Sequence, residues 1–299
     1  MSTVGLWTVT SYFNPIHYER RKANYRVFRE RLNCPLVTVE LSSNGEFELS
    51  ESDADILIRL PDNGPLSVLF QKERMLNIGF YHVPAEVDKI AWIDCDTILG
   101  PDWAERTSDA LDAHLICQPF SRVYLLDKDE LPEQALYKHR QMAGWLSTTF
   151  NYSQPEGQRQ EWSTNGFGWA ARRSVLKYGL YPAMVMGSGD SALAGVIYEP
   201  IRDRILSHMT TNAWKVDYLC WVDSLRLSQA DVGFVRGSAF HLWHGDMQDR
   251  GYGTRYEDFK AFPFDPLVDL VNGEWAPHRT DLQEFARKYF ESRREDGHV

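Results

Sequence analysis

The sequence predicts an α/β protein built on a mostly parallel, doubly wound central sheet with helices on both faces. Short apolar runs of strand length alternate with longer segments in which apolar residues recur at helical spacing. Such alternation is typical of parallel sheets whose strands are joined by crossover helices. The chain of 299 residues, with 43% hydrophobic and 25% charged residues, has the composition of a globular protein large enough for this architecture.

The expected elements alternate regularly in the first third of the chain. Buried-strand character is found in four short apolar runs, Leu6–Thr10, Leu36–Leu41, Ile56–Leu60 and Lys89–Ile93. Apolar residues at helical spacing lie between them, at Tyr18–Leu32 and Leu69–Val83. Beyond Gly100 the expected features are a strand at Ala113–Pro119, a polar segment without a clear strand at Asp127–Gln160, a strand at Val232–Phe240, and a C-terminal helix with a charged, frayed end.

Charge and targeting features exclude several classes of protein. A net charge of −10 argues against binding of nucleic acid over a broad basic surface. It does not exclude a local basic channel. The chain has no apolar stretch of about 18 residues, the length that a membrane span needs, and its first residues lack the pattern of a secretory signal. Its four cysteines, without CxxC spacing, indicate reduced thiols. We therefore expect a cytoplasmic protein without a membrane span.

Three D-x-D triplets occur, and their surroundings separate them. Asp53–Asp55 and Asp127–Asp129 lie in polar segments, where solvated turn carboxylates are the ordinary interpretation. Asp94 and Asp96 directly follow a buried strand, where ionised carboxylates are costly unless something compensates them. Extended backbone sends both side chains to the same side, at the strand end where open α/β sheets bind ligands, so both can face one divalent cation. The alternative is a pair that caps backbone N–H groups.

The segment leading to this triplet has a recognisable pattern. Phe70–Phe80 reads F-Q-K-E-R-M-L-N-I-G-F, and the strand that ends in Asp94–Asp96 follows shortly. This resembles the β-1,4-galactosyltransferase family, in which a helix reading F-N-R-A-K-L-L-N-V-G-F precedes the D-x-D strand, and five of the eleven positions are identical. The resemblance covers islands between about residues 65 and 250. It implies the GT-A glycosyltransferase fold, a nucleotide-sugar donor (UDP-linked in that family) and Mn²⁺ (or Mg²⁺) as the cofactor.

Two later segments extend the resemblance on the acceptor side. Asn165–Val175 is similar to the stretch before the family's catalytic loop, and Met186–Asp190 reads M-G-S-G-D where the family reads W-G-G-E-D. The family's glutamate and tryptophan are replaced here, so acceptor specificity is not carried over. The residues that the resemblance places on the acceptor side are Trp169, Gly187, Ser188 and Gly189.

Asp190 stands where the family has its proposed catalytic base. A base at this position accepts the proton of an acceptor hydroxyl while the oxygen attacks the anomeric carbon, which implies inversion. The alternative, which does not exclude the first, is an N-cap of the helix that begins at Ser191.

The segment His241–His244 resembles the family's M-x-x-H, whose histidine ligates the metal. On an extended strand a spacing of three puts two side chains on opposite sides, so only one is expected to reach the cation, His244 being the better placed. A structural role for both His241 and His244 is the alternative. With Asp94 and Asp96 they make a mixed oxygen and imidazole set, which suits Mn²⁺.

Donor binding is expected from several further positions. The resemblance implies that Lys72, on the helix before the acidic triplet, contacts phosphate, a solvated helix face being the alternative. Arg250 and Arg255 lie on a glycine-punctuated loop that can fold over a diphosphate. By analogy with GT-A folds, the end of the first strand holds the nucleoside. The remaining donor-binding positions are Thr10, Ser11 and Phe13 on that strand, with Cys95 inside the triplet.

These features predict a metal-dependent glycosyltransferase of the hexosyltransferase class. We expect one domain over residues 1–275, with a donor-binding half at about 1–120 and an acceptor-side half, including the polar insertion, at about 121–275, followed by a C-terminal helix and tail over 276–299. The acceptor stays open between a saccharide, a glycolipid, a protein and a modified nucleic-acid base. The alternatives are a non-catalytic sugar-nucleotide-binding protein and a metal-dependent nucleotidyltransferase, which normally has a glycine-rich basic loop where Thr10–Pro15 stands here.

Overall fold

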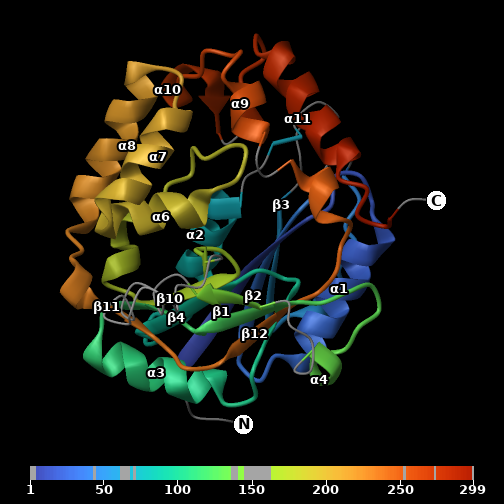
Figure 1. The fold of residues 1–299 in the computed structure, drawn as a ribbon, viewed down its shortest axis with the longest axis vertical. Helices are drawn as coiled ribbons and strands as arrows, with labels where there is room; N and C mark the ends of the chain where they lie inside the picture. The colour runs from blue at the N-terminus through green and yellow to red at the C-terminus, as the bar shows by residue number, and fades with distance from the viewer. Residues whose placement is uncertain are drawn as a thin grey trace, which may run out of the picture.

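The computed structural model describes residues 5–42, 45–60, 68–69, 72–135, 141–144, 163–251, 254–272 and 274–297. The strands of its central sheet are β1 (Leu6–Phe13), β2 (Leu36–Leu41), β3 (Ile56–Leu60), β4 (Lys89–Ile93), β6 (Ile116–Gln118), β10 (Gly168–Arg172) and β11 (Val232–Phe234). In this part of the chain, seven strands lie in the order β11-β6-β10-β4-β1-β2-β3 (Figure 1). All neighbouring pairs are parallel except those of β10, which runs antiparallel to both β4 and β6.

A second sheet lies beside the acidic triplet. Its strands are β5 (Thr97–Leu99), β12 (Ser238–His241), β7 (Arg122–Leu125), β8 (Gln141–Gly144) and β9 (Ser163–Thr164), in that spatial order. Because β5 follows Asp96 directly and pairs antiparallel with β12, His241 lies opposite Thr97. This pairing brings the two distant parts of the chain that carry the predicted metal ligands next to each other. A short ribbon of β13 (Leu270–Val271) and β14 (Glu274–Trp275) completes the strands.

Helices cover both faces of the central sheet. They are α1 (Glu19–Arg31), α2 (Lys72–His82), α3 (Trp103–Ala113), α4 (Pro132–Ala135), α6 (Gly189–Ile197), α7 (Glu199–His208), α8 (Asn212–Leu225), α9 (Arg255–Phe259), α10 (Pro266–Asp269) and α11 (Thr280–Ser292). Figure 1 shows α3 on one side of the sheet and the group α6 to α8 on the other.

Alternation along β4 explains why both faces are covered. Ile90 and Trp92 belong to the apolar core that α2, α6 and α8 complete, whereas Ala91 and Ile93 belong to the core on the side of α1 and α3. All four side chains are at most 2% exposed. A strand that is apolar on both sides must be buried on both sides, so the short run Lys89–Ile93 becomes a central strand. The predicted α/β fold class is confirmed.

The expected strands and helices of the first third are confirmed, with β2, β3 and β4 at their predicted bounds. The single strand expected at Val232–Phe240 is wrong, because the chain breaks before Ser238 and continues in the second sheet as β12. The absence of a strand between Asp127 and Gln160 is also wrong. There β8 pairs with β7, a long-range partner that a local apolar pattern does not reveal. Residues 136–140 and 145–162 of that segment lie outside the described residues.

The C-terminal tail is packed rather than frayed. Glu295 is 0% exposed and Arg293 6%, and the carboxylate of Glu295 contacts the guanidinium groups of Arg21 and Arg293. A charged segment packs in this way when its ions are paired inside the protein, which composition alone does not show. The division of the chain at residue 275 stays a prediction.

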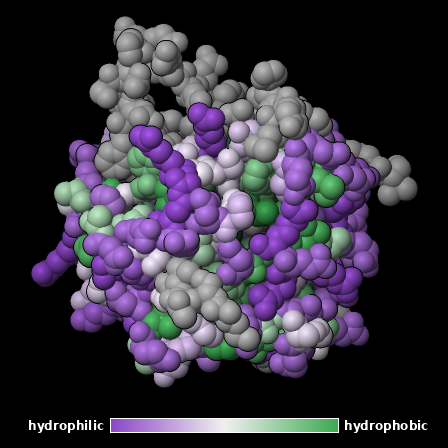
Figure 2. Space-filling view, turned by 90° about the horizontal axis from the view of Figure 1, so that it is seen from below, coloured by the Kyte–Doolittle hydropathy of each residue, from purple (hydrophilic) through white to green (hydrophobic). Residues whose placement is uncertain are grey.

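The outer surface and the cysteines agree with the compositional expectations. The face shown in Figure 2 is predominantly hydrophilic, with apolar residues scattered among the polar ones. Among the described residues, no helix has the length and apolar character needed to cross a membrane. All four cysteines lie in described segments as free thiols, with Cys220 exposed and the other three buried.

Candidate active site

A cavity of about 390 Å³ gathers most of the predicted site residues. It opens at the carboxyl ends of β1 and β4, where ligands bind in open α/β sheets. The predicted residues that line it are Ser11, Phe13, Lys72, Asp94, Cys95, Asp96, Gly187, Ser188, Gly189, Asp190, His241, His244, Arg250 and Arg255.

Two predicted residues do not line the cavity. The Thr10 side chain is fully buried and its hydroxyl donates to the carbonyl oxygen of Ile93 at 2.7 Å, which links β1 to β4. Trp169 is 0% exposed in the apolar core, and its ring N–H donates to the carbonyl oxygen of Asn165 at 2.8 Å. Both residues are structural in this protein, because β1 and β10 turn these side chains toward neighbouring strands and the core.

Asp96, His241 and His244 form a compact group of potential metal ligands. One ligand atom from each lies within 4.8 Å of the other two. The Nε2 atom of His244 is 3.0 Å from Asp96 Oδ2 and 3.2 Å from the Nε2 atom of His241, which itself is 3.7 Å from Asp96 Oδ1. Both imidazoles are buried, at 6% and 4% exposed.

Only one of the two histidines was expected to reach the cation, on the ground that strand alternation separates them, but both imidazoles approach Asp96. Strand β12 ends at His241, so the alternation of an extended backbone does not continue to His244. The N–H of Leu242 donates to the carbonyl oxygen of Asp96 at 2.8 Å, which holds the two segments together. Both rings therefore turn to the same carboxylate.

The charge state of this group fits a divalent cation. Burial lowers the pKa of His241 well below its usual value, so its imidazole is neutral and keeps a lone pair for a metal. Burial raises the pKa of Asp96, but His244 and His241 outweigh it and hold this pKa below the usual range. Two facing imidazole nitrogens and an ionised carboxylate are a donor set for Mn²⁺, and also for Fe²⁺ or Zn²⁺.

Asp94 belongs to a second group, around Lys72. The Nζ atom of Lys72 is 2.7 Å from Asp94 Oδ1 and 2.8 Å from Asp190 Oδ2. Its side chain is only 14% exposed, so the solvated-face alternative for Lys72 is wrong. Burial lowers the pKa of Lys72, but Asp190 and Asp94 outweigh it and raise this pKa well above its usual value. Lys72 is therefore a permanent cation that separates the two carboxylates.

Asp190 is not the cap of its helix. Helix α6 begins at Gly189 after Ser188, whose backbone is left-handed with φ of 71° and whose hydroxyl accepts from Arg255 at 2.9 Å. Asp190 thus lies in the first turn, where the helix dipole favours a negative charge. Its carboxylate is bound by Lys72 and faces the cavity, as a base would require.

Comparisons with known proteins give structural matches only. No protein-family model and no curated protein matches the chain. The chain is similar to glucosyl-3-phosphoglycerate synthase from Mycobacterium tuberculosis, in complex with Mn²⁺, UDP-glucose and phosphoglyceric acid, at 11% identity over 89% of this chain and 82% of that one, with a TM-score of 0.38.

Two further solved structures give comparable values. One is the mannosyltransferase PcManGT from Pyrobaculum calidifontis in complex with GDP-Man and Mn²⁺ (12% identity, 95% and 69% coverage, TM-score 0.43). The other is TarS of S. aureus in complex with UDP-GlcNAc (9%, 96% and 72%, TM-score 0.41). These matches do not establish a family.

A carboxylic acid that no sequence pattern indicates also lines the cavity. Glu73 is 3% exposed, lines the cavity, and its Oε2 atom has no hydrogen-bond partner. It fits because Gly189 has no side chain: a Cβ there would lie 1.8 Å from Glu73 Oε1. Burial is the main cause that raises the pKa of Glu73 to about 8, assisted by Asp190 and opposed by Lys72. Glu73 therefore holds its proton at neutral pH.

Replacing Glu73 with glutamine is expected to remove a pH dependence of stability. In the wild type the folded state keeps the Glu73 proton up to about pH 8, whereas the unfolded chain loses it near 4.5. The contribution of protonated Glu73 to the free energy of unfolding is therefore fully present below about pH 4.5 and is lost as the pH rises to about 8. Denaturant unfolding should show Glu73→Gln gaining at least about 1 kcal/mol on the wild type between pH 5.5 and 8.5, the equivalent of under one pKa unit. The exposed Glu86→Gln is the control and should follow the wild type. If the free energies of unfolding of wild type and Glu73→Gln change with pH in the same way, the raised pKa of Glu73 is contradicted.

Basic residues surround the cavity more densely than the sequence analysis predicted. Arg250 is 3% exposed and donates to the carbonyl oxygen of His244 at 3.3 Å. Arg255 donates to the hydroxyl of Ser188, in the loop before α6, at 2.9 Å. The additional arginines that line the cavity are Arg21, Arg204 and Arg293. They come from α1, α7 and the C-terminal tail, so no local motif connects them. Together these guanidinium groups give the cavity the character of an anion-binding site.

Proposed function

We propose that this protein is a metal-dependent glycosyltransferase of GT-A type that moves a sugar from a nucleotide-sugar donor, UDP-linked, to an acceptor hydroxyl with inversion. One observation carries the proposal: a cation-type donor set (Asp96, His241, His244) and a lysine-bound carboxylate (Asp190) line the same arginine-rich cavity. The resemblance of Phe70–Phe80 and Met186–Asp190 to a glycosyltransferase family supports the same assignment.

The donor side of this proposal rests on charge. Asp96, His241 and His244 would hold a divalent cation, whose positive charge would stabilise a departing diphosphate. Arg250 and Arg255 contribute guanidinium groups that bind phosphate oxygens, since they lie along the same cavity. Ser11 and Phe13, at the end of β1, are left for the nucleoside.

The acceptor side rests on Asp190. Its carboxylate accepts the proton of the acceptor hydroxyl as the oxygen bonds to the anomeric carbon and the bond from that carbon to the diphosphate breaks. Lys72 holds the carboxylate in one orientation through a contact of 2.8 Å. Gly187, Ser188 and Gly189 line the same cavity as Asp190, at the positions that the resemblance assigns to the acceptor side.

A thermal-shift screen of nucleotide sugars, each with and without metal, tests this function. We expect UDP-sugars with Mn²⁺ to raise the melting temperature, since a ligand at 100 times its dissociation constant stabilises the native state by about 2.7 kcal/mol. Mg²⁺, Fe²⁺ and Zn²⁺ in the same screen decide the metal. Release of UDP from the stabilising donor identifies a transferase. Release of pyrophosphate from a nucleoside triphosphate identifies a nucleotidyltransferase. Binding of the donor without turnover identifies a non-catalytic protein. Absence of any shift contradicts the proposal.

A further inference from the structure

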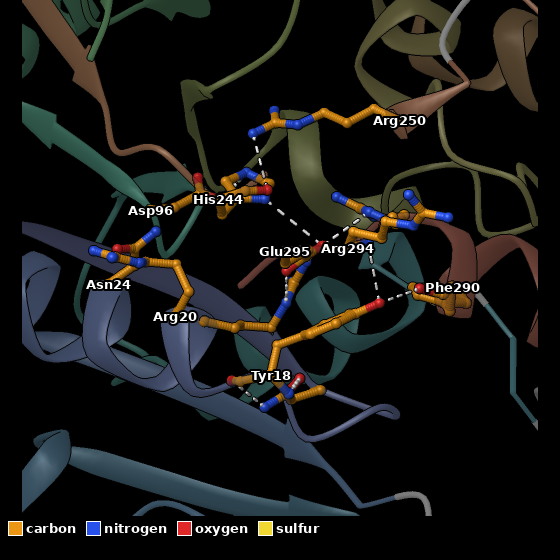
Figure 3. A network of polar contacts seen from close by, with 12 residues as sticks. Tyr18, Arg20, Asn24, Asp96, His244, Arg250, Phe290, Arg294 and Glu295 are labelled. Carbon is orange, nitrogen blue, oxygen red and sulfur yellow. Dashed lines mark hydrogen bonds and ion pairs between the residues drawn. The ribbon is translucent and has the colours of Figure 1, made fainter. Parts of the chain in front are cut away.

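Glu295 lies against the back of the predicted metal ligand His244. Figure 3 shows the imidazole of His244 between Asp96 and Glu295. Its Nε2 atom faces Asp96 Oδ2 at 3.0 Å, and its Nδ1 atom is 3.6 Å from Glu295 Oε1. Glu295 is fully buried, and the buried Nδ1 atom of His244 has no hydrogen-bond partner, so the Glu295 carboxylate is the acidic group that faces it. The geometry places a carboxylate on each side of one ring.

We propose that Glu295 is a positioning residue for His244, and that the tail segment 293–297 completes the metal site. This inference rests on the proposed metal-dependent function. A histidine that binds a metal through one nitrogen is oriented by the group that accepts from the other, which fixes its tautomer and strengthens it as a ligand. Glu295 stands where that group is needed, although it comes from a segment far from the D-x-D in sequence.

Two arginines keep the Glu295 carboxylate in place. Arg21 approaches it with two atoms, Nε at 2.8 Å from Oε2 and Nη2 at 2.6 Å from Oε1, and Arg293 Nε is 2.8 Å from Oε1. Burial raises the pKa of Glu295, but Arg21 and Arg293 outweigh it and hold this pKa well below the usual range. Arg21 and Arg293 also line the cavity, so the carboxylate links the metal ligand to two cavity cations.

The tail is fixed at both sides of Glu295. Gly245, directly after His244, has a φ of +89° and packs so closely on the tail that a Cβ there would lie 2.9 Å from the carbonyl oxygens of Arg293 and Arg294. Beyond Glu295, the Asp296 carboxylate accepts from the backbone N–H groups of Glu19 at 3.3 Å and Arg20 at 2.8 Å. Asp296 thus accepts hydrogen bonds from the first turn of α1, where the N-cap residue Tyr18 makes no side-chain hydrogen bond to the helix.

A further contact ties the tail to the entrance of α1. The hydroxyl of Tyr18 donates to the carbonyl oxygen of Phe290 at 2.9 Å and accepts from the N–H of Arg294 at 3.2 Å, as Figure 3 shows. The tail therefore takes one defined path from α11 past Gly245 to α1. This path is what brings Glu295 to His244.

Metal binding without any sugar donor tests the inference. The metal-free wild type and Glu295→Gln are titrated with Mn²⁺, and free Mn²⁺ is measured by electron paramagnetic resonance. We expect the variant to bind Mn²⁺ about 10- to 100-fold more weakly, the usual effect of losing a partner of a ligating histidine. Glu291→Gln, the same substitution on the exposed face of α11, is the matched control and should bind as the wild type does.

A spectroscopic readout separates positioning from general loosening. In the Zn²⁺-loaded wild type, nitrogen NMR of labelled histidine should show His244 with its proton on Nδ1, and in Glu295→Gln this signal should shift or broaden. If Glu295→Gln is folded and binds Mn²⁺ with the wild-type affinity, the inference is wrong while the proposed function stands. If the wild type itself binds no Mn²⁺, both fail.

Asp296→Ala covers the case in which Glu295→Gln does not fold. This substitution releases the tail from α1 without touching the cavity, because Asp296 contacts backbone groups of α1 and does not line the pocket. We expect severalfold weaker Mn²⁺ binding with an unchanged fold by circular dichroism. Wild-type affinity in Asp296→Ala overturns the role of the tail in that case.

Discussion

Asp96→Ala is expected to abolish Mn²⁺ binding at millimolar concentration and to lower sugar transfer at least about 10³-fold, because charge stabilisation by a bound metal is worth several kcal/mol. The reason lies in the group itself. Within the described part of the chain, Asp96 is the carboxylate that both buried imidazoles of the group approach, at 3.0 and 3.7 Å, so its loss leaves two imidazole nitrogens without the oxygen ligand that a hard cation prefers. Metal titration and UDP release from the donor measure the two effects.

The chain offers a matched control for this substitution in another D-x-D triplet. Asp127→Ala removes an exposed carboxylate of the Asp127–Asp129 triplet, outside the cavity. It should leave both measurements at wild-type values. Full turnover of Asp96→Ala in saturating Mn²⁺ contradicts the assignment of the metal site.

Asp190→Asn is expected to lower turnover about 10²- to 10⁴-fold, the usual contribution of a general base, while Mn²⁺ and donor still bind. The amide keeps the size of the side chain but accepts no proton at neutral pH. Asp190 is not a member of the metal group, and its contact with Lys72 is 2.8 Å long, so the metal site should be preserved. Hydrolysis of the donor, with water in place of the acceptor, measures turnover, and the thermal shift with donor and Mn²⁺ measures binding.

Asp203→Asn, an exposed residue of α7, is the control for the same chemical change. Wild-type turnover in Asp190→Asn excludes Asp190 as the base and leaves its carboxylate with the structural role of holding Lys72. A wild type that binds donor and Mn²⁺ but shows no turnover with any acceptor points instead to the non-catalytic alternative.

Local sequence signals predicted the central sheet and the acidic triplet. The runs at β2, β3 and β4 are short, apolar and bounded by polar residues, and such runs depend little on distant partners. The prediction that Asp94 and Asp96 face one cation assumed an extended triplet. In the structure Asp94 contacts Lys72, whereas Asp96 lies with His241 and His244. The N–H of Thr97 donates to the carbonyl oxygen of Asp94 at 3.0 Å, so the chain turns there. Side-chain alternation applies to extended backbone, and the triplet is not extended.

The residues that were missed depend on contacts between distant segments. Glu73 reads as an exposed helix residue until the absence of a side chain at Gly189 provides its space. Glu295 belongs to a charged tail whose burial follows from Arg21, a residue of α1. Conversely, Trp169 was placed at the site by resemblance alone, and the alternation of β10 turns it into the core. Pairings of this kind are set by tertiary packing, and no local pattern encodes them.

The predicted metal site depends on the register in which β12 pairs with β5. His241 meets Asp96 because it lies opposite Thr97 in this antiparallel pair. A slip of one residue would turn His241 to the opposite face of the sheet and withdraw its nitrogen from Asp96. A molecule with a complete central sheet but a misaligned β12 is therefore compact, yet unable to hold the cation. Under the proposed function, Mn²⁺ would bind the correctly aligned form and stabilise it by mass action.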